Sequence, residues 1–290
     1  MASFIEKRDD YWILKDDAGY GNALALKKAW SSRYLDLITK HKIKIIRLNE
    51  YTGWRGSDVS FLLTIPGING VDILSDRVTD VSPLFAMKRL KTLSLYCKAK
   101  LAGDFAKLQH LQSVGLGWRN AYISIFELTT LTRLNILRYP KTDLTGWKCN
   151  SLLKKISISS GKLKRLTGIE RFPNLRELEL FYCPKLECLD AITPLRSVQR
   201  LRLGNCPRIL DLSAIANLPE LRELEVENCR DIRSLAPIVN CTKLTRLQIA
   251  GNTTIIDGDF RVLLQLPMLR KVLLAKRKHY SHTDDELEKK

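Results

Sequence analysis

A short pattern repeats along the chain, and it restricts the possible folds more than any other feature. Four segments show it most clearly, each starting 23 residues after the one before: LRELELFYC from Leu175, VQRLRLGNC from Val198, LRELEVENC from Leu221 and LTRLQIAGN from Leu244. Each fits LxxLxLxx(C/N), with Val or Ile replacing some leucines. A fixed period of this length is typical of solenoids, so the sequence predicts a stack of similar coils.

Looser copies of the pattern extend the stack on both sides. They start at Ile43, Ile68, Leu90, Leu111, Leu131, Leu153 and Leu269. The repeats therefore number about eleven, of about 20–25 residues each, and run from residue 42 to residue 278. The LxL pair places two apolar side chains on one face of a short strand. Stacking the coils buries these side chains in one continuous column, and the strands form a parallel sheet.

Two segments carry a resemblance to a known superfamily. VTDVSPLFAMKRLKTLSL and ILDLSAIANLPELRELEV resemble the short repeats of internalins and of protein-phosphatase regulators in the leucine-rich-repeat superfamily. The resemblance covers about four fifths of the chain. It implies an α/β leucine-rich-repeat solenoid that is curved, with the parallel sheet on the concave face and short or 3-10 helical turns on the convex face. It also implies a binding surface on the concave face, without naming a partner, because the superfamily binds many unrelated molecules.

A solenoid must cover its terminal coils, and both ends of this chain suit that purpose. Residues 22–40 are expected to form an amphipathic helix that starts at Asn22 and carries Leu26, Trp30, Tyr34, Leu37 and Ile38 on one face. We therefore predict a helical cap over residues 1–41, the solenoid over 42–278 and a polar tail or cap over 279–290. A membrane-surface helix is the alternative for 22–40, which the acidic stretch before it disfavours.

The chain has seven cysteines, and its N-terminus has no apolar run of the signal-peptide type. We therefore expect a cytoplasmic protein with reduced thiols. Cys183, Cys206 and Cys229 occupy one position of the repeat, and Asn252 takes that position in the next repeat. The resemblance implies an inward-pointing asparagine ladder here, in which a small buried cysteine can replace asparagine. Zinc binding and a disulfide between neighbouring coils are the alternatives.

Charge divides the expected sheet face into two halves. In the second half Glu177, Glu179, Glu223 and Glu225 alternate by strand with arginines, which predicts ion pairs across neighbouring strands. In the first half the corresponding residues are mostly small or neutral. Aromatic residues and arginines flank this floor, a composition typical of protein–protein contact sites. The predicted partner-binding residues are Tyr51, Trp54, Arg55, Tyr96, Trp118, Arg119, Arg133, Arg138 and Tyr139. The alternative is that the aromatic residues only fill irregular turns.

The net charge of +17 leaves a second kind of partner open. It suits an acidic protein, a nucleic acid or an anionic membrane surface. Basic residues recur at one position beside the strands and form a possible stripe: Lys44, Lys91, Lys154, Arg176, Arg222 and Arg270. No apolar stretch is long enough to cross a membrane, so membrane insertion is not expected.

The sequence lacks the common catalytic motifs, including GxxxxGK[ST], GxSxG and HExxH. His279 and His282 with Asp284 and Asp285 give only a weak indication of metal binding, and we predict no enzyme activity, cofactor or metal. The expected function is protein binding by a monomer. Its sharpest form is a bacterial immunity or inhibitor protein, on an architectural resemblance to stand-alone bacterial repeat proteins. The alternatives are a basic scaffold associated with nucleic acid and a scaffold with several weak protein partners.

Overall fold

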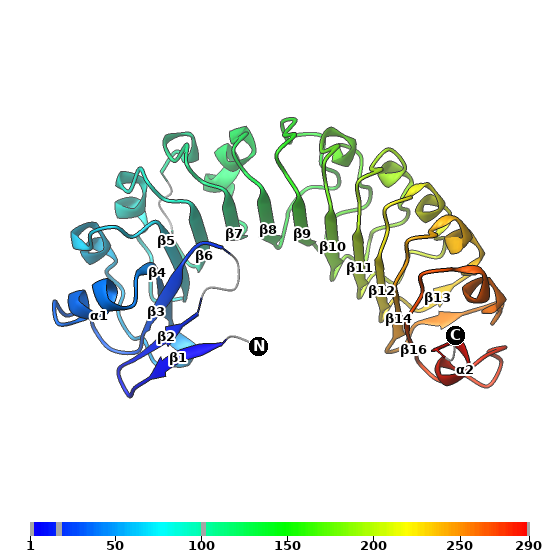
Figure 1. Cartoon of the computed structure of the whole chain (residues 1–290). Helices are drawn as coiled ribbons and strands as arrows, with labels where there is room; N and C mark the ends of the chain where they lie inside the picture. The colour runs from blue at the N-terminus through cyan, green and yellow to red at the C-terminus, as the bar shows by residue number, and fades with distance from the viewer. Residues whose placement is uncertain (1–2, 16–18, 100–102, 289–290) are drawn as a thin grey trace. The chain divides into compact units, whose positions relative to one another are not determined.

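The structure, a computed structural model, describes residues 3–15, 19–99 and 103–288. It forms two compact units, Met1–Thr132 and Arg133–Lys290. In each unit the strands lie side by side along one side of the coils, and short 3-10 turns lie along the other (Figure 1). Within the described residues, each of the eleven predicted repeats contributes one strand to the parallel strands of its unit. The predicted solenoid of strands and 3-10 turns is confirmed.

The first unit begins with antiparallel strands and continues with parallel ones. Strand β1 (Phe4–Lys7) pairs with β2 (Tyr11–Leu14), and β2 pairs with β3 (Asn22–Leu26), both antiparallel. From β3 onward the strands are parallel: β4 (Ile43–Asn49), β5 (Gly70–Ser75), β6 (Thr92–Cys97) and β7 (Ser113–Gly117). Turn η1 (Glu50–Thr52) follows β4 directly, at the ends of the strands. The opposite side holds α1 (Tyr34–Lys40), η2 (Ser60–Thr64), η3 (Ser82–Ala86), η4 (Phe105–Lys107) and η5 (Asn120–Glu127).

The second unit repeats one arrangement with little variation. Its parallel strands are β8 (Arg133–Leu137), β9 (Lys155–Ser159), β10 (Glu177–Phe181), β11 (Arg200–Gly204), β12 (Glu223–Glu227), β14 (Arg246–Ala250) and β16 (Lys271–Leu274). Strands β13 (Asp231–Ile232) and β15 (Thr254–Ile255) form a small separate sheet. The turns are η6 (Ile169–Arg171), η7 (Asp190–Ile192), η8 (Ser213–Asn217), η9 (Ala236–Asn240) and η10 (Arg261–Gln265), and α2 (Asp284–Glu288) ends the described chain.

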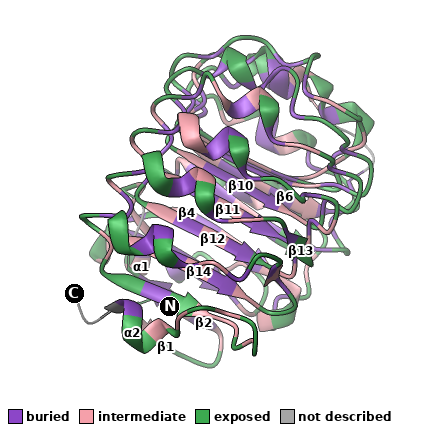
Figure 2. Cartoon of the chain, turned by 90° about the vertical axis from the view of Figure 1, so that its right-hand side faces the viewer, coloured by how far each residue is buried: buried purple, intermediate pink, exposed green. Residues whose placement is uncertain are grey.

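The strand leucines form the apolar column that holds the second unit together. Leu178, Leu201, Leu224 and Leu247 pair in register from β10 to β14, and all four are fully buried. Side chains alternate along a strand, so the residues between the leucines lie on the opposite face of the sheet. Figure 2 shows buried residues along the strands and exposed residues on the connecting turns. The face of the sheet that points away from the column is therefore the part of the strands that a partner can reach.

The predicted amphipathic helix over residues 22–40 is wrong in its first half. Residues 22–26 form strand β3, and only residues 34–40 are helical, as α1. Ala23, Leu24, Ala25 and Leu26 are all buried, because β3 lies between β2 and β4 and both of its faces are covered. Asn22 does not begin a helix. Its side-chain amide instead donates a hydrogen bond to the carbonyl of His41 at 2.9 Å.

The cysteine column is buried as predicted, but its continuation was assigned to the wrong residue. The thiols of Cys183, Cys206 and Cys229 are fully buried, and each lies 3.4–3.9 Å from backbone carbonyl oxygens of its own and the preceding coil. In the next coil Asn252 is exposed, and the buried residue is Thr253. The Thr253 hydroxyl donates to the carbonyl of Val226 and accepts from the backbone N–H of Cys229. Threonine therefore continues the column.

The C-terminal segment folds onto the last coil. The hydroxyls of Tyr280 and Ser281 accept hydrogen bonds from the backbone N–H groups of Ile255 and Phe260. Thr283 begins helix α2, because its backbone N–H and the Glu286 carboxylate are 2.8 Å apart and its hydroxyl accepts from the Glu286 N–H. This reciprocal pair is a capping box. Thr283 is therefore the N-cap of α2.

Burial separates the cysteines by reactivity. The hydrogen bond with Cys183, together with burial, raises the pKa of Cys206 to about 12, and burial raises that of Cys241 to about 11. The thiolate is the reactive form, so both thiols stay protonated and inert near pH 8. Cys149 is exposed.

We expect iodoacetamide to label Cys149 in the native protein and to label Cys206 and Cys241 only in urea, as followed by peptide mass spectrometry. Equal labelling of all three thiols in the native state would contradict the burial of Cys206 and Cys241.

Candidate functional site

The sheet face of the second unit is covered by a ladder of ion pairs. The pairing register sets Glu177 against Arg200 and Arg200 against Glu223. An Arg200 nitrogen lies 2.7 Å from the Glu223 carboxylate, and an Arg202 nitrogen lies 2.8 Å from that of Glu225. The predicted cross-strand pairs are confirmed. Because each of these charges already has a partner of opposite sign, this face offers little net charge to another molecule.

Lys155 and Glu179 form the most buried part of this ladder. The Lys155 ammonium lies 2.7 Å from Glu179 and 3.0 Å from Glu177. The Glu179 side chain is only 9% exposed, and Arg202 approaches it to 3.6 Å. A carboxylate with so little access to water depends on its cations for stabilisation.

The sheet face of the first unit has a different composition. Paired in register across it are Arg47, Asp72, Ser94 and Gly115. Arg47 and Asp72 form an ion pair at 3.6 Å, and burial raises the pKa of Asp72 while Arg47 opposes the rise. The next two residues are small and uncharged. This face therefore has one internal ion pair and then a neutral floor.

Tyr96 lies across that floor. A Cβ atom on Gly115 would come within 2.5 Å of the Tyr96 hydroxyl oxygen, so the glycine leaves the room that the ring occupies. Burial raises the pKa of Tyr96 to about 12, with the charge of Asp72 adding to the rise. Leu74 pairs with Tyr96 in register and is 36% exposed. Together the two side chains form an apolar surface with a phenol at its edge.

The start of the same face carries apolar residues that the sequence did not single out. Leu14, Ala23 and Ala25 form a small buried cluster, and the half-buried Trp12 and Ile45 pack against it. Because these residues come from β2, β3 and β4, only the pairing of the N-terminal strands reveals the cluster. Trp12 is the aromatic residue that sequence reasoning missed. Its signal is the short apolar run YWIL, which fits a strand as well as part of the cap predicted over residues 1–41.

The predicted partner-binding residues differ in their accessibility. In the first unit Tyr51, Arg55 and Arg119 are exposed, and Tyr96 and Trp118 are half-buried. Trp118 stacks on Phe126 with the ring centroids 5.5 Å apart, and the Arg119 guanidinium donates to the carbonyl of Cys97. In the second unit, Arg133 and Arg138 are exposed.

Trp54 and Tyr139 are buried and cannot present their rings to a partner in this structure. Trp54 is 1% exposed and Tyr139 is 2% exposed. The Tyr139 hydroxyl donates to the carbonyl of Asp143 and accepts a hydrogen bond from the Trp147 indole at 3.0 Å. For these two residues the structure supports the alternative interpretation, in which aromatic rings fill irregular turns.

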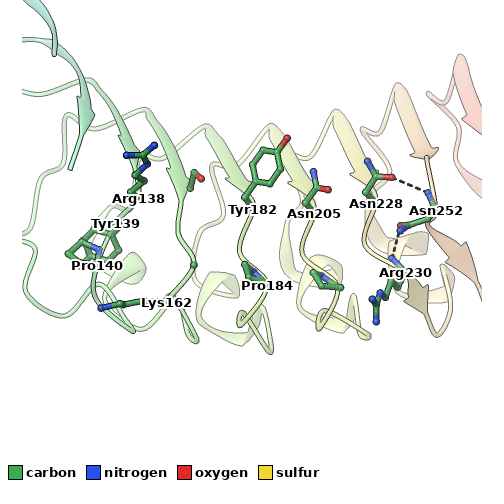
Figure 3. Close-up of a pocket in the computed structure, with 13 residues that line it drawn as sticks. Arg138, Tyr139, Pro140, Lys162, Tyr182, Pro184, Asn205, Asn228, Arg230 and Asn252 are labelled. Atoms are coloured by element: carbon green, nitrogen blue, oxygen red, sulfur yellow. Dashed lines mark hydrogen bonds between the residues drawn. The ribbon is translucent and has the colours of Figure 1, made fainter. Parts of the chain in front are cut away.

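A groove runs along the carboxyl ends of the strands in the second unit (Figure 3). It has a volume of about 800 Å³ and receives residues from six successive coils. Its lining consists of Arg138, Tyr139, Pro140, Ser159, Gly161, Lys162, Tyr182, Pro184, Asn205, Pro207, Asn228, Arg230 and Asn252. Sequence reasoning named only Arg138 and Tyr139 of this set as site residues. The sequence signal that could have indicated this groove is the residue before each cysteine of the buried column: Tyr182, Asn205 and Asn228.

The first unit has a smaller basic groove at the opposite ends of its strands. Its volume is about 470 Å³, and it is lined by Lys44, Gly67, Ile68, Asn69, Arg89, Lys91 and His110. Within the described residues Lys44, Arg89 and Lys91 form no ion pair. Lys44 and Lys91 belong to the predicted basic stripe, and all six members of the stripe are exposed. The groove therefore gathers positive charge in one place.

The part of the chain that the structure describes has neither a metal-binding cluster nor a helix that could span a membrane. Residues 3–15, 19–99 and 103–288 contain no group of three or more His, Cys, Asp or Glu side chains arranged to hold a metal ion. The His279 side chain instead contacts the backbone of the last coil, because its Nε2 atom lies 2.9 Å from the carbonyl oxygen of Ile255. None of the helices in this part of the chain has the length and hydropathy of a membrane span.

Comparison with solved structures identifies the fold. An internalin (inlF) from Listeria monocytogenes superposes with a TM-score of 0.58 at 17% sequence identity, over 89% of this chain and 81% of that one. This chain has the leucine-rich-repeat fold. InlJ from the same species, whose functional domain includes a cysteine ladder, gives a TM-score of 0.55 at 18% identity over 95% of this chain and 63% of InlJ. No protein-family model and no curated protein sequence matches the chain.

A plant structure shares the fold as well. The leucine-rich-repeat ectodomain of the Arabidopsis receptor kinase HAESA, in complex with a peptide hormone ligand, gives a TM-score of 0.51 at 15% identity. The alignment covers 75% of this chain and 43% of that ectodomain. These likenesses establish how the coils stack.

The buried end of the ion-pair ladder can be tested by removing one cation. We expect Lys155→Met to lower the free energy of unfolding by about 2 kcal/mol, because it leaves Glu177 and Glu179 without their closest counter-charge. Lys154→Met is the matched control, since Lys154 is the exposed lysine just before β9. Urea denaturation followed by circular dichroism measures both. Equal effects of the two substitutions would show that the ladder contributes nothing to stability.

Proposed function

We propose that the chain is a protein-binding module and that its first unit carries the contact surface on the strand face. The observation that supports this most is the contrast between the two faces. In the second unit the charges on the strands pair with one another. In the first unit the strands present the half-buried Tyr96, the partly exposed Leu74 and a floor of small residues. Apolar and aromatic groups with few unpaired charges match the centre of protein–protein interfaces.

The accessible predicted residues complete this surface. Tyr51 is 79% exposed, and Arg55 and Arg119 are exposed on the turns that follow β4 and β7. Tyrosine, tryptophan and arginine contribute most of the binding free energy in typical interfaces. Tyr51, Arg55, Tyr96, Trp118 and Arg119 are therefore the proposed contact residues in this unit. Arg133 and Arg138 are retained as contacts of the second unit, and Trp54 and Tyr139 act by supporting the turns from inside.

The finer proposal is that binding inactivates the partner, as an immunity protein inactivates a toxin. Repeats account for about four fifths of the chain, so most of its residues are folded to present a surface. The HAESA ectodomain, which is in complex with a peptide hormone, is an example of ligand binding by the same fold. We propose a monomer that acts in the cytoplasm. The net charge of +17 favours an acidic protein as the partner.

A second candidate function is binding to nucleic acid. It is favoured by the groove of the first unit, where Lys44, Arg89 and Lys91 meet without an ion pair among the described residues. Phosphate groups bound there would replace counterions, so the affinity would fall steeply with salt. We rank it second because the sheet face of the second unit is locally neutral, whereas a nucleic-acid surface is expected to be evenly basic.

The proposal is tested by isolating the partner from an extract of the native host on the immobilised chain and then measuring affinities by calorimetry. We expect Trp118→Ala combined with Arg119→Ala to weaken binding by about 2 kcal/mol or more, because both residues belong to the proposed contact. Glu225→Gln, in the ion-pair ladder, serves as the control and should leave the affinity unchanged. Melting curves of both variants establish that the chain is still folded.

Two results would contradict the proposal. Loss of the partner in Glu225→Gln with no change in the double variant would place the contact in the second unit. Binding of a labelled 20-nucleotide RNA that weakens steeply between low and moderate salt, and that Lys44→Glu with Lys91→Glu abolishes, would favour the second candidate function.

A further inference from the structure

The groove of the second unit is built by a backbone feature that recurs in several of its coils. The residue that follows the strand has a positive φ after β8, β10, β11 and β12: 62° at Arg138, 52° at Tyr182, 57° at Asn205 and 53° at Asn228. Ser160, which follows β9, does not share it. This left-handed conformation turns the chain sharply, so the next residue enters the core and the left-handed residue stays on the rim. Figure 3 shows these side chains in a row along the strand ends.

Three backbone N–H groups of this rim are already used. The N–H of Tyr182 donates to the carbonyl of Gly204, that of Asn205 to Glu227 and that of Asn228 to Ala250. These positions can therefore donate to a ligand only through their side chains. Those side chains decide which ligand can be recognised.

Donors predominate among the polar side chains of the groove. The Asn228 side-chain oxygen accepts from the backbone N–H of Asn252, and the Asn252 oxygen accepts from that of Arg230 (dashed in Figure 3). Each oxygen has thus used one of its two acceptor sites, and these two amides act mainly as donors through their NH₂ groups. Arg138, Lys162 and Arg230 add cations, and within the described residues their side chains form no ion pair. A ligand that satisfies this groove must supply acceptors.

No carboxylate lines the groove to neutralise these cations. Glu227 and Asp231 flank Asn228 and Arg230 in the sequence, but neither is among the residues that form the groove. The strand face of the same unit is different, since its arginines are paired with glutamates. The groove is therefore one place in this unit, besides the exposed stripe residues Lys154, Arg176, Arg222 and Arg270, where positive charge is available to an outside molecule.

The dimensions suit an extended chain. Six coils about 4.8 Å apart give a length of about 24 Å, which is the span of about seven residues of an extended peptide at about 3.3 Å each. The wall is apolar where Pro140, Pro184 and Pro207 contribute to it, and the Tyr182 ring is 64% exposed beside them. Three cations over this length are too few for a strand of nucleic acid, which carries a phosphate at every nucleotide. They suit a peptide with two or three carboxylates.

We propose that this groove binds an extended acidic peptide segment of about seven or eight residues. The carboxylates pair with Arg138, Lys162 and Arg230. The amides of Asn205, Asn228 and Asn252 donate to the carbonyl groups of the peptide, and Tyr182 packs against one of its side chains. This site belongs to the second unit and does not depend on the surface proposed for the first.

The test begins with a random octapeptide library displayed on phage and selected on the immobilised full-length chain. We expect the recovered peptides to be enriched in Asp and Glu relative to the unselected library. A recovered peptide is then synthesised with a fluorescein label, and its affinity is measured by fluorescence anisotropy. Arg138→Glu combined with Arg230→Glu should weaken binding about tenfold or more, because like charges then face each other in the groove.

Arg222→Glu is the matched control. It makes the same change of charge at an exposed arginine just before β12, at the other end of the strands, and should leave the peptide affinity unchanged. Trp118→Ala with Arg119→Ala should also leave it unchanged, which separates this site from the surface of the first unit. If the double groove variant fails to fold, Lys162→Glu replaces it, since Lys162 is exposed and has no left-handed backbone.

Three outcomes would overturn the proposal. The first is a selection without acidic enrichment, and the second is a loss of affinity in Arg222→Glu as large as in the groove variant. The third is displacement of the peptide by an octamer of deoxythymidine that binds more tightly than the peptide does. That result would assign the groove to nucleic acid instead.

Discussion

The in-register stacking of each coil on the next is the constraint on which the rest of the structure depends. No coil can bury its own apolar face, so the leucines of one coil are covered only by those of its neighbours. Leu178, Leu201, Leu224 and Leu247 show this directly, because they are paired along the sheet and fully buried. A constant spacing then has a further effect: a residue type at one position of the repeat becomes a column along the unit.

Those columns explain the difference between the surfaces. Where the spacing is regular, glutamates and arginines of successive strands meet and neutralise each other, and the cysteines line up in the core. In the first unit the strands also pair in register, but residues of different types share a position, so Arg47 and Asp72 are followed by Ser94 and Gly115. The strand face there carries Tyr96 over Gly115 in place of a ladder of charges. The left-handed residues after the strands of the second unit form a column of their own. Because their side chains stay on the rim, that column becomes a groove and not a core.

Sequence reasoning succeeded wherever the repeat itself carried the information. The strands, their register, the ion-pair ladder and the buried thiols all follow from positions in one template. The same reasoning failed where a contact distant in sequence decides the outcome. The segment Asn22–Leu26 is a short apolar run that fits a helix or a strand, and its pairing with β2 and β4 makes it a strand. Likewise, Thr253 replaces Asn252 in the core because the turn there differs from the template.

The predicted site residues also divide into those whose exposure follows from the repeat and those whose burial depends on contacts outside it. The exposure of Tyr51 and Arg119 was predictable from their place in the repeat, but the burial of Trp54 and Tyr139 depends on irregular turns that no template describes. Trp12 was missed because its neighbours on the sheet come from strands that the template does not include. The groove was missed because it arises from backbone angles, which the sequence signals only through the asparagines before Cys206 and Cys229.

The central claim is that a protein partner contacts the strand face of the first unit. Hydroxyl-radical footprinting with mass spectrometry tests it most directly, by comparing the oxidation of side chains in the free chain and in the complex with the partner isolated from the host. The account predicts that Tyr51, Tyr96 and Trp118 become protected while Leu273, on the strand face of the second unit, keeps its reactivity. Unchanged oxidation of all three aromatic residues in a fully formed complex would contradict it.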